Sequence, residues 1–176
     1  MMLVFDLETT GLPYHPLAKL KDQPRIIEYG GVLLNRRGEV TMEDSILINP
    51  EISLPLEIVK ITGLTDTDLA EALLFEAALP RIKTQFKDAN VMVSHNLPFD
   101  KGILKYGLAR CNISDFPWPQ RELCTVQQYA PLWGRNPRLV ELYEQVIGKP
   151  LKQTHRALDD VRALVEIIIK EQLFKI

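Results

Sequence analysis

Two carboxylates separated by a single residue, Asp6 and Glu8, close an apolar run at the start of the chain. The run over residues 1–5 predicts a short buried strand. Side chains two residues apart on a strand point to the same face, so we expect the two carboxylates side by side where the chain leaves a sheet. Like charges that close repel unless a cation lies between them. A divalent metal such as Mg²⁺ or Mn²⁺, which takes oxygen ligands, is therefore the expected partner.

The remaining apolar runs predict an α/β fold in one domain, residues 1–176. Short runs rich in Val, Ile and Leu are typical of buried strands, and longer segments with apolar residues three or four apart are typical of helices. Early strands followed by alternating helices and strands predict a mixed sheet. We expect strands at 1–5, 25–35, 40–48, 90–94 and 123–126, helices at 56–61, 73–87, 99–111, 137–146 and 155–174, and a polar loop at 13–24.

Composition and net charge disfavour two classes of protein, those that coat duplex nucleic acid and those that span a membrane. The net charge of −2 disfavours a protein that coats duplex nucleic acid through many phosphates, although bound metal ions would add local positive charge. No apolar stretch approaches the length of a membrane span, so no membrane partner is expected. Cys111 and Cys124 form neither a CxxC pair nor a disulfide framework, and a reducing cytoplasm is the expected location.

A second acidic position, Asp100, follows the strand expected at 90–94. In the segment SHNLPFD, Asn96 suits a helix N-cap and Pro98 suits the first turn. Asp100 in that turn is also favoured by the helix dipole. Taken alone, this segment is explained by a well-formed helix start.

A third acidic position lies in the segment THRALDD, where Thr154 is the expected N-cap of a helix that begins at His155. Apolar residues between 158 and 168 define one face of that helix. At about 100° per residue, Asp160 lies about 100° from the centre of this face and Asp159 about 155° away. We therefore expect Asp160 at the boundary between core and solvent, and Asp159 facing water.

Together, the three segments resemble the DEDDh family of 3′–5′ exonucleases, the DnaQ-like group that includes proofreading subunits of DNA polymerases. The family's Asp-x-Glu motif matches Asp6 and Glu8 in FDLETTG, and its second aspartate matches Asp100 in HNLPFD. The third motif, His-x-Ala-x-x-Asp, matches His155 and Asp160 in HRALDD. Each motif is weak by itself, but the three occur in order across nearly the whole chain.

This resemblance implies an RNase H-like fold with a mixed five-stranded sheet flanked by helices, and two divalent metal ions, Mg²⁺ or Mn²⁺, in a cleft. Asp6, Glu8 and Asp160 would bind metal directly, and Asp100 directly or through water. His155 would act as the general base toward the attacking water, which suits a group with an ordinary pKa near neutrality. The product would be a nucleoside 5′-monophosphate.

The same resemblance implies a pocket for the 3′-terminal nucleotide. The stretch Ile61–Leu64 matches the family's loop over the terminal base less well, and a helix that ends at glycine explains it equally. The partner would be nucleic acid with a free 3′ end, single-stranded or frayed DNA in preference to RNA, and a DNA polymerase is a further partner that the family allows. The pocket residues would be Thr9, Thr10, Gly11, Leu12, Thr62, Asn96 and Phe99.

Three alternatives stay open at this point. An exoribonuclease of the same family differs by room for a 2′-hydroxyl, which the sequence does not settle. A catalytically silent module that binds nucleic acid or a polymerase would not need all four carboxylates and the histidine. An RNase H-like endonuclease would leave the histidine of HRALDD without a role.

Overall fold

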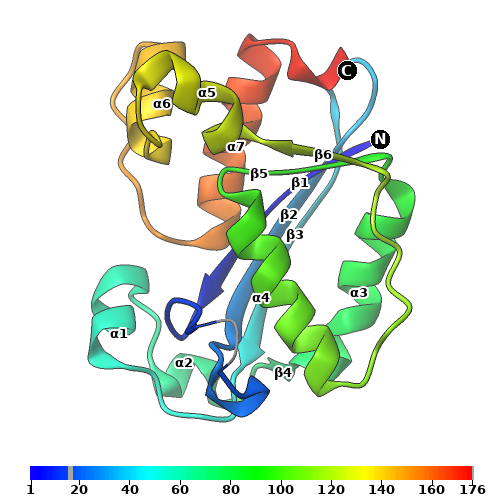
Figure 1. Ribbon diagram of the computed structural model, residues 1–176, viewed down its shortest axis with the longest axis vertical. Coiled ribbons are helices and arrows are strands. Elements are labelled where there is room, and N and C mark those ends of the chain that lie inside the picture. The colour runs from blue at the N-terminus through cyan, green and yellow to red at the C-terminus, as the bar shows by residue number, and fades with distance from the viewer. Residues whose placement is uncertain (16–17, 176) are drawn as a thin grey trace.

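The computed structural model describes residues 1–15 and 18–175. Residues 16 and 17 of the predicted loop, and residue 176 of the predicted domain, lie outside the described residues. Within the described chain, six strands form one mixed sheet in the order β4-β3-β2-β1-β5-β6 (Figure 1). The strands are β1 (Met2–Thr9), β2 (Ile26–Leu34), β3 (Val40–Asn49), β4 (Leu73–Leu74), β5 (Val91–Ser94) and β6 (Arg121–Cys124).

β1 lies inside the sheet, where it pairs with strands of both directions. It runs antiparallel to β2 and parallel to β5, so the carboxyl ends of β1 and β5 meet at the same edge of the sheet. β2 and β3 are antiparallel, and β6 continues the parallel part beside β5. The acidic residues at the end of β1 are thereby brought next to whatever follows β5.

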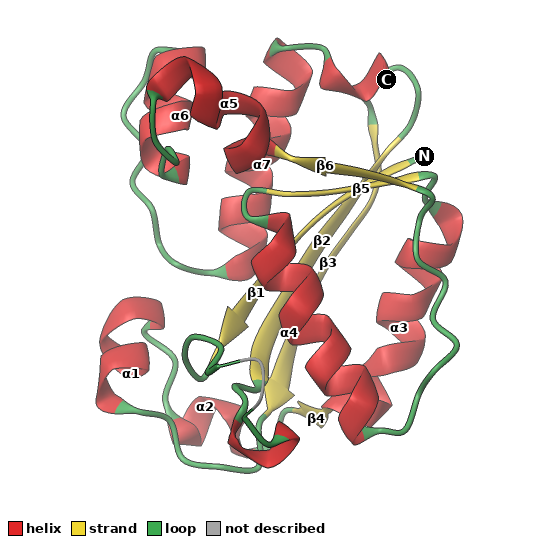
Figure 2. Cartoon of the chain, viewed as in Figure 1, coloured by secondary structure: helices red, strands yellow, loops and turns green. Residues whose placement is uncertain are grey.

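Helices cover both faces of the sheet (Figure 2). On one face, α3 (Phe75–Asp88) and α4 (Leu97–Arg110) pack against a core that includes Leu3 and Phe5 of β1. On the other, α7 (Ala157–Lys170) packs with α6 (Leu139–Ile147) against a core that includes Met2 and Val4. Because side chains alternate along a strand, the even-numbered Asp6 and Glu8 continue the row that faces α7.

In the part of the chain that the structure describes, three further α-helices and two 3-10 helices, at Leu20–Asp22 and Leu173–Lys175, complete the fold. α5 (Thr125–Trp133) follows β6 directly and contributes Tyr129 to the core beneath α7. α1 (Leu56–Thr62) and α2 (Asp66–Ala70) are held near the start of β2 by a small separate cluster that contains Ile27, Leu64 and Leu69. Among the described residues, no helix combines the length and the apolar character that crossing a membrane requires.

The structure corrects several expected elements. The sheet has six strands and not five, because Leu73 and Leu74 pair with the end of β3 as β4 instead of opening the helix expected at 73–87. β6 ends at Cys124, and residues 125 and 126 begin the unpredicted α5, although Val126 is β-branched. The unpredicted α2 carries a capping box between Thr65 and Asp68, a local signal that was present in the sequence.

Candidate active site

The acidic residues of the three segments meet at one edge of the sheet. Asp6 and Glu8 lie near the carboxyl end of β1, inside the strand and not beyond it. α4 starts just after β5 at the same edge and carries Asp100 in its first turn. α7 starts against β2 and carries Asp160 in its first turn. One strand and two helix starts, separated by up to about nine-tenths of the chain, thus supply one acidic group.

Asp100 is fixed by contacts to the neighbouring strands. Its side chain is 2% exposed. Its Oδ1 accepts a hydrogen bond from the backbone N–H of Leu7 at 3.3 Å, and its Oδ2 accepts one from the Ser94 hydroxyl. Since Leu7 lies between Asp6 and Glu8 in β1, these bonds tie Asp100 directly to the strand that carries the other two carboxylates.

The start of α7 differs from the sequence-based expectation. The helix begins at Ala157 with Arg156 at the N-cap position, and Thr154 donates its hydroxyl proton to Asp159 at 2.8 Å instead of capping the helix. His155 lies before the helix in a left-handed conformation with φ of 52°. A left-handed residue interrupts a right-handed helix, so His155 lies outside α7 and not at its first position as expected.

The two adjacent aspartates separate as predicted. Asp160 is 7% exposed and accepts a hydrogen bond from Gln153 Nε2 at 2.8 Å. The Asp159 side chain is 47% exposed and pairs with Arg162 on the same helix. The helical geometry of the sequence therefore selected the correct aspartate for the interior, although it placed the helix start two residues too early.

The structure adds a residue that sequence reasoning missed. Glu28 lies in β2 directly opposite Glu8 and is 1% exposed. It accepts two hydrogen bonds from the Arg156 guanidinium and one from the backbone N–H of Ala157. The available signal was a single carboxylate inside the otherwise apolar run IIEYGGVLL, since acidic residues are almost never fully buried unless paired.

Burial and mutual repulsion raise the pKa of the clustered carboxyl groups. Removal from water, followed by the charges of Asp160, Glu28 and Asp100, raises the pKa of Glu8 to about 8, although the nearby Arg156 acts in the opposite sense. Burial likewise raises the pKa of Asp100 to about 7 against the lowering effect of its hydrogen bonds. Burial also raises the pKa of Asp160 and, together with the charge of Asp100, that of Asp6.

The donor set fits a divalent metal ion. One ligand atom each of Glu8, His155 and Asp160 lies within 4.8 Å of the others. Asp6 lies on the same strand face as Glu8, two residues away. Carboxylate oxygens are the ligands that Mg²⁺ and Mn²⁺ take, and a cation would relieve the repulsion that raises these pKa values. The described residues therefore form a group suited to divalent metal, with the imidazole beside it.

The raised pKa values predict that the metal-free protein loses stability as pH rises. Folded Glu8, with its pKa moved from 4.5 to about 8, holds a proton that the unfolded chain releases, so the free energy of unfolding falls between about pH 5 and pH 8. Metal binds the deprotonated groups, so we expect Mn²⁺ to raise Tm more at pH 8 than at pH 5. Thermal unfolding with EDTA or Mn²⁺ across this range measures both effects.

Two variants serve as controls for that measurement. Glu8→Gln should flatten the fall in Tm with pH, because it removes one of the shifted groups. Asp159→Asn should change the slope much less, because Asp159 is exposed and its charge is only a lesser cause of the raised pKa of Asp160. A metal-free Tm that stays constant or rises from pH 5 to pH 8 would contradict the assigned shifts.

The residues expected to contact a terminal nucleotide are placed around this group in two ways. The Thr9 hydroxyl donates to the carbonyl of Gly11, two residues later, at 2.7 Å. The Thr10 hydroxyl accepts a hydrogen bond from the backbone N–H of Arg25 at 2.9 Å. The Thr62 hydroxyl is similarly engaged by the carbonyl of Ile58. These threonines are buried and shape the backbone more than they present free hydroxyls.

Leu12 and Asn96 are instead presented to solvent. Leu12 is 77% exposed, so its side chain is available to a ligand. Asn96 occupies the N-cap position of α4, but its side chain makes no capping hydrogen bond, contrary to expectation. Phe99, in the first turn of α4, is half-buried and packs against the core.

The sequence of this chain matches a family of nucleases. The model of the RNase_T family, described as "Exonuclease", matches residues 3–168. The DNA polymerase III subunit epsilon of Treponema pallidum (strain Nichols) is 30% identical over 166 residues, which cover 93% of this chain and 72% of that subunit. The family-model match at residues 3–168 includes all three acidic segments and the histidine.

Two further relatives extend the comparison. A Mycobacterium tuberculosis (strain CDC 1551 / Oshkosh) protein named as a bifunctional exonuclease/endonuclease is 34% identical over 94% of this chain, which spans only 25% of that protein's length. The crystallographic structure of the nuclease domain of 3′hExo, a DEDDh family member bound to rAMP, aligns with a TM-score of 0.78 at 18% identity, over 98% of this chain and 91% of that chain. The predicted RNase H-like fold is thereby confirmed.

Proposed function

The chain belongs to the RNase_T exonuclease family, and on that premise we propose that it is a metal-dependent 3′–5′ exonuclease that releases nucleoside 5′-monophosphates from DNA. The observation that carries this proposal is the meeting of Asp6, Glu8, Asp100 and Asp160 at one edge of the sheet with His155 beside them. A protein that only bound nucleic acid would gain nothing from gathering four carboxylates, two of them buried, at the cost of their mutual repulsion.

Asp6, Glu8 and Asp160 would hold the metal, and Asp100 would do so directly or through water. When bound, two divalent ions would offset the negative charge that develops on the phosphate and would lower the pKa of a water molecule. The carboxylates fix the place of that positive charge, because Asp100 is tied to β1 and Asp160 to Gln153.

His155 is the proposed general base. Its ring lies within reach of the Glu8 and Asp160 carboxylates, at the opening of the acidic group, where a proton from an attacking water can pass to the imidazole. His155 has a left-handed backbone and lies before α7, so the position of its ring beside the carboxylates is not set by helical geometry. The proton then leaves to solvent from a residue that precedes α7.

Leu12 is the proposed wedge against the terminal base, and its exposed side chain supports that role. Thr9, Thr10 and Gly11 would present their backbone to the terminal nucleotide, while Thr62, Asn96 and Phe99 would line the remaining walls. Single-stranded or frayed DNA ends suit this protein, because a chain with a net charge of −2 offers little attraction to a long duplex.

The relatives support DNA as the substrate without excluding RNA. The name of the Treponema subunit refers to DNA polymerase, whereas the 3′hExo structure holds a ribonucleotide. We also propose a polymerase partner and a cytoplasmic location, because the matched Treponema protein is named as a subunit of a DNA polymerase. An exoribonuclease remains the second candidate, because the choice rests on room for a 2′-hydroxyl.

A digestion experiment tests the function. Single-stranded DNA and RNA oligomers of one sequence, labelled at the 5′ end, are incubated with Mg²⁺, with EDTA, and with the Asp160→Asn protein. We expect a ladder that shortens from the 3′ end of DNA, faster than of RNA, only with metal and only with intact Asp160. A faster RNA ladder would favour the exoribonuclease, and no cleavage in Mg²⁺ or Mn²⁺ would favour a binding module.

A further inference from the structure

An ion pair between a buried carboxylate and a partly exposed guanidinium lies beside the acidic group and joins β2 to the start of α7. Glu28 accepts hydrogen bonds from Arg156 Nε at 2.9 Å and from Arg156 Nη2 at 2.8 Å. Both oxygens of the carboxylate are thus engaged by the planar guanidinium, the bidentate arrangement that fixes orientation as well as distance. The Glu28 side chain is 1% exposed and that of Arg156 is 39% exposed.

Glu28 also replaces the missing N-cap of α7. Arg156, at the N-cap position, offers no side-chain hydrogen bond to its own helix. The backbone N–H of Ala157, the first residue of α7, donates instead to Glu28 Oε2 at 3.1 Å. A carboxylate at this end of a helix satisfies an otherwise unpaired donor and is favoured by the helix dipole. The cap of α7 is therefore supplied by a strand that lies 129 residues earlier.

Gly30 lets α7 approach β2 closely at the same place. It lies two residues after Glu28, on the same face of the strand, and pairs with Asp6 in the sheet. A Cβ atom at this position would lie 2.5 Å from the backbone nitrogen of Leu158 and 2.6 Å from the carbonyl carbon of Ala157. The first turn of α7 thus rests on β2 directly beside the two residues that face Asp6 and Glu8.

We infer that Glu28 and Arg156 are positioning residues, which set the distance of His155 and Asp160 from Asp6 and Glu8. This inference rests on the proposed function. His155 precedes Arg156 in the chain, and the backbone N–H of Asp160 donates to the Arg156 carbonyl at 3.0 Å. Arg156 is held by the contact of its guanidinium with Glu28 and by the hydrogen bond from Asp160 to its carbonyl. The position of β2 therefore sets the positions of His155 and Asp160.

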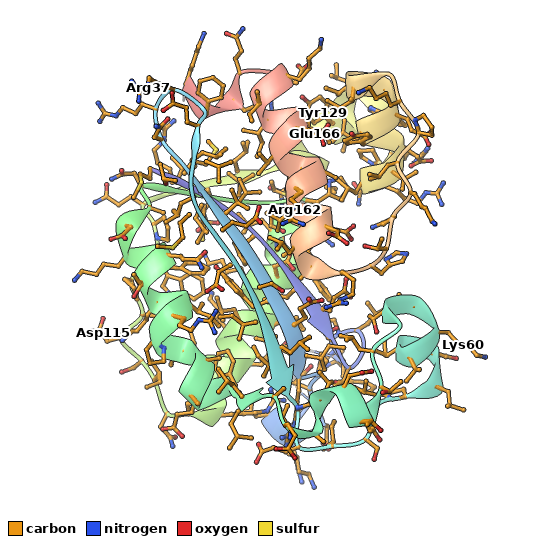
Figure 3. The ribbon with its side chains drawn as sticks, turned by 180° about the vertical axis from the view of Figure 1, so that it is seen from behind. Arg37, Lys60, Asp115, Tyr129, Arg162 and Glu166 are labelled. Atoms are coloured by element: carbon orange, nitrogen blue, oxygen red, sulfur yellow. The ribbon has the colours of Figure 1, made fainter. Side chains whose placement is uncertain are left out.

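The surface pair Arg162–Glu43 provides a matched control. It also joins α7 to the sheet, through β3, and its guanidinium also contacts both carboxylate oxygens. Figure 3 labels Arg162 on α7. Its side chains are 53% and 36% exposed, and Arg162 lies six residues after Arg156, where it also pairs with Asp159 at 3.4 Å. If any salt bridge between α7 and the sheet were enough to position His155 and Asp160, loss of either pair would have the same effect on Mn²⁺ affinity and kcat.

The test compares Arg156→Ala, Arg156→Lys and Glu28→Gln with Arg162→Ala. Mn²⁺ affinity is measured by titration without substrate, well below the Tm of each protein, and kcat and KM are measured on a DNA oligomer. We expect Arg156→Ala and Glu28→Gln to weaken Mn²⁺ binding on the order of 10–100-fold and to lower kcat with little change in KM. Arg162→Ala should leave Mn²⁺ affinity and kcat unchanged.

Arg156→Lys distinguishes geometry from charge and protects the test against a variant that fails to fold. It keeps a cation beside Glu28 but cannot form the two-pronged contact, so it should recover only part of the lost Mn²⁺ affinity. Wild-type Mn²⁺ affinity and kcat in the folded lysine variant would overturn the inference, as would equal losses in Arg162→Ala. If the wild-type protein cuts no strand while Mn²⁺ affinity still falls as stated, the proposed function fails and the positioning role stands.

Discussion

Asp160→Asn is expected to lower kcat by on the order of 10³-fold or more, because an amide lacks the negative charge through which Asp160 would hold a metal ion. Bound divalent metal supplies several kcal/mol to the transition state of phosphodiester cleavage, and each ~1.4 kcal/mol corresponds to a factor of ten in rate. The side chain is 7% exposed and lies beside Glu8 and His155, so its loss is not compensated by solvent. Initial rates on a single-stranded DNA oligomer measure the effect.

The adjacent Asp159 makes the control for this prediction unusually close. Asp159→Asn removes the same charge from the neighbouring position of the same helix turn, where the side chain pairs with Arg162 and Thr154. We expect its kcat to stay within about twofold of wild type, since surface substitutions away from special contacts change little. An inactive Asp159 variant beside an active Asp160 variant would mean that the wrong aspartate was assigned to the site.

His155→Ala is expected to lower kcat on the order of 10²–10⁴-fold while Mn²⁺ binding is largely retained, because the proposed general base would contribute to proton transfer and the proposed carboxylate ligands would hold the metal. The left-handed backbone at this residue tolerates alanine at modest cost, so the fold should persist. Rates on DNA and Mn²⁺ titration of the same protein preparation separate the two effects. Added imidazole should restore part of the activity.

The proximity of His155 to the carboxylates gives a clear opposite outcome. Its ring nitrogen lies within 4.8 Å of ligand atoms of Glu8 and Asp160, a distance from which it could also bind metal. If His155→Ala loses Mn²⁺ affinity to the same extent as Asp160→Asn, and imidazole restores nothing, the histidine is a ligand and not a base. Normal activity of this variant would remove it from the mechanism altogether.

Much of the site could be predicted because its signals are local. The spacing of Asp6 and Glu8 places both on one face of any strand, and β1 has them on the face toward α7. The helical period separates Asp160 from Asp159 in the same way, and the structure has the first buried and the second exposed. Such periodicities depend only on backbone geometry, so they hold whatever the rest of the fold does.

Other features depended on contacts between distant segments. Leu73 and Leu74 carry the apolar character expected of a helix, yet they form β4 because the end of β3 offers a partner. The pattern at 154–160 is typical of a helix with Thr154 as its cap, yet α7 starts at Ala157 because Glu28 caps it from β2. Neither partner lies within the window in which a local pattern can be recognised.

The sequence by itself thus determined the kind of chemistry, since it fixed which carboxylates share a face and which histidine accompanies them. Only the tertiary structure decided how they meet. It set the left-handed turn at His155, the contact of Asp100 with the backbone of Leu7, and the pairing of Glu28 with Arg156. The physical reason is that a buried charge must find its partner somewhere in the fold, and that partner is chosen by packing across the sheet.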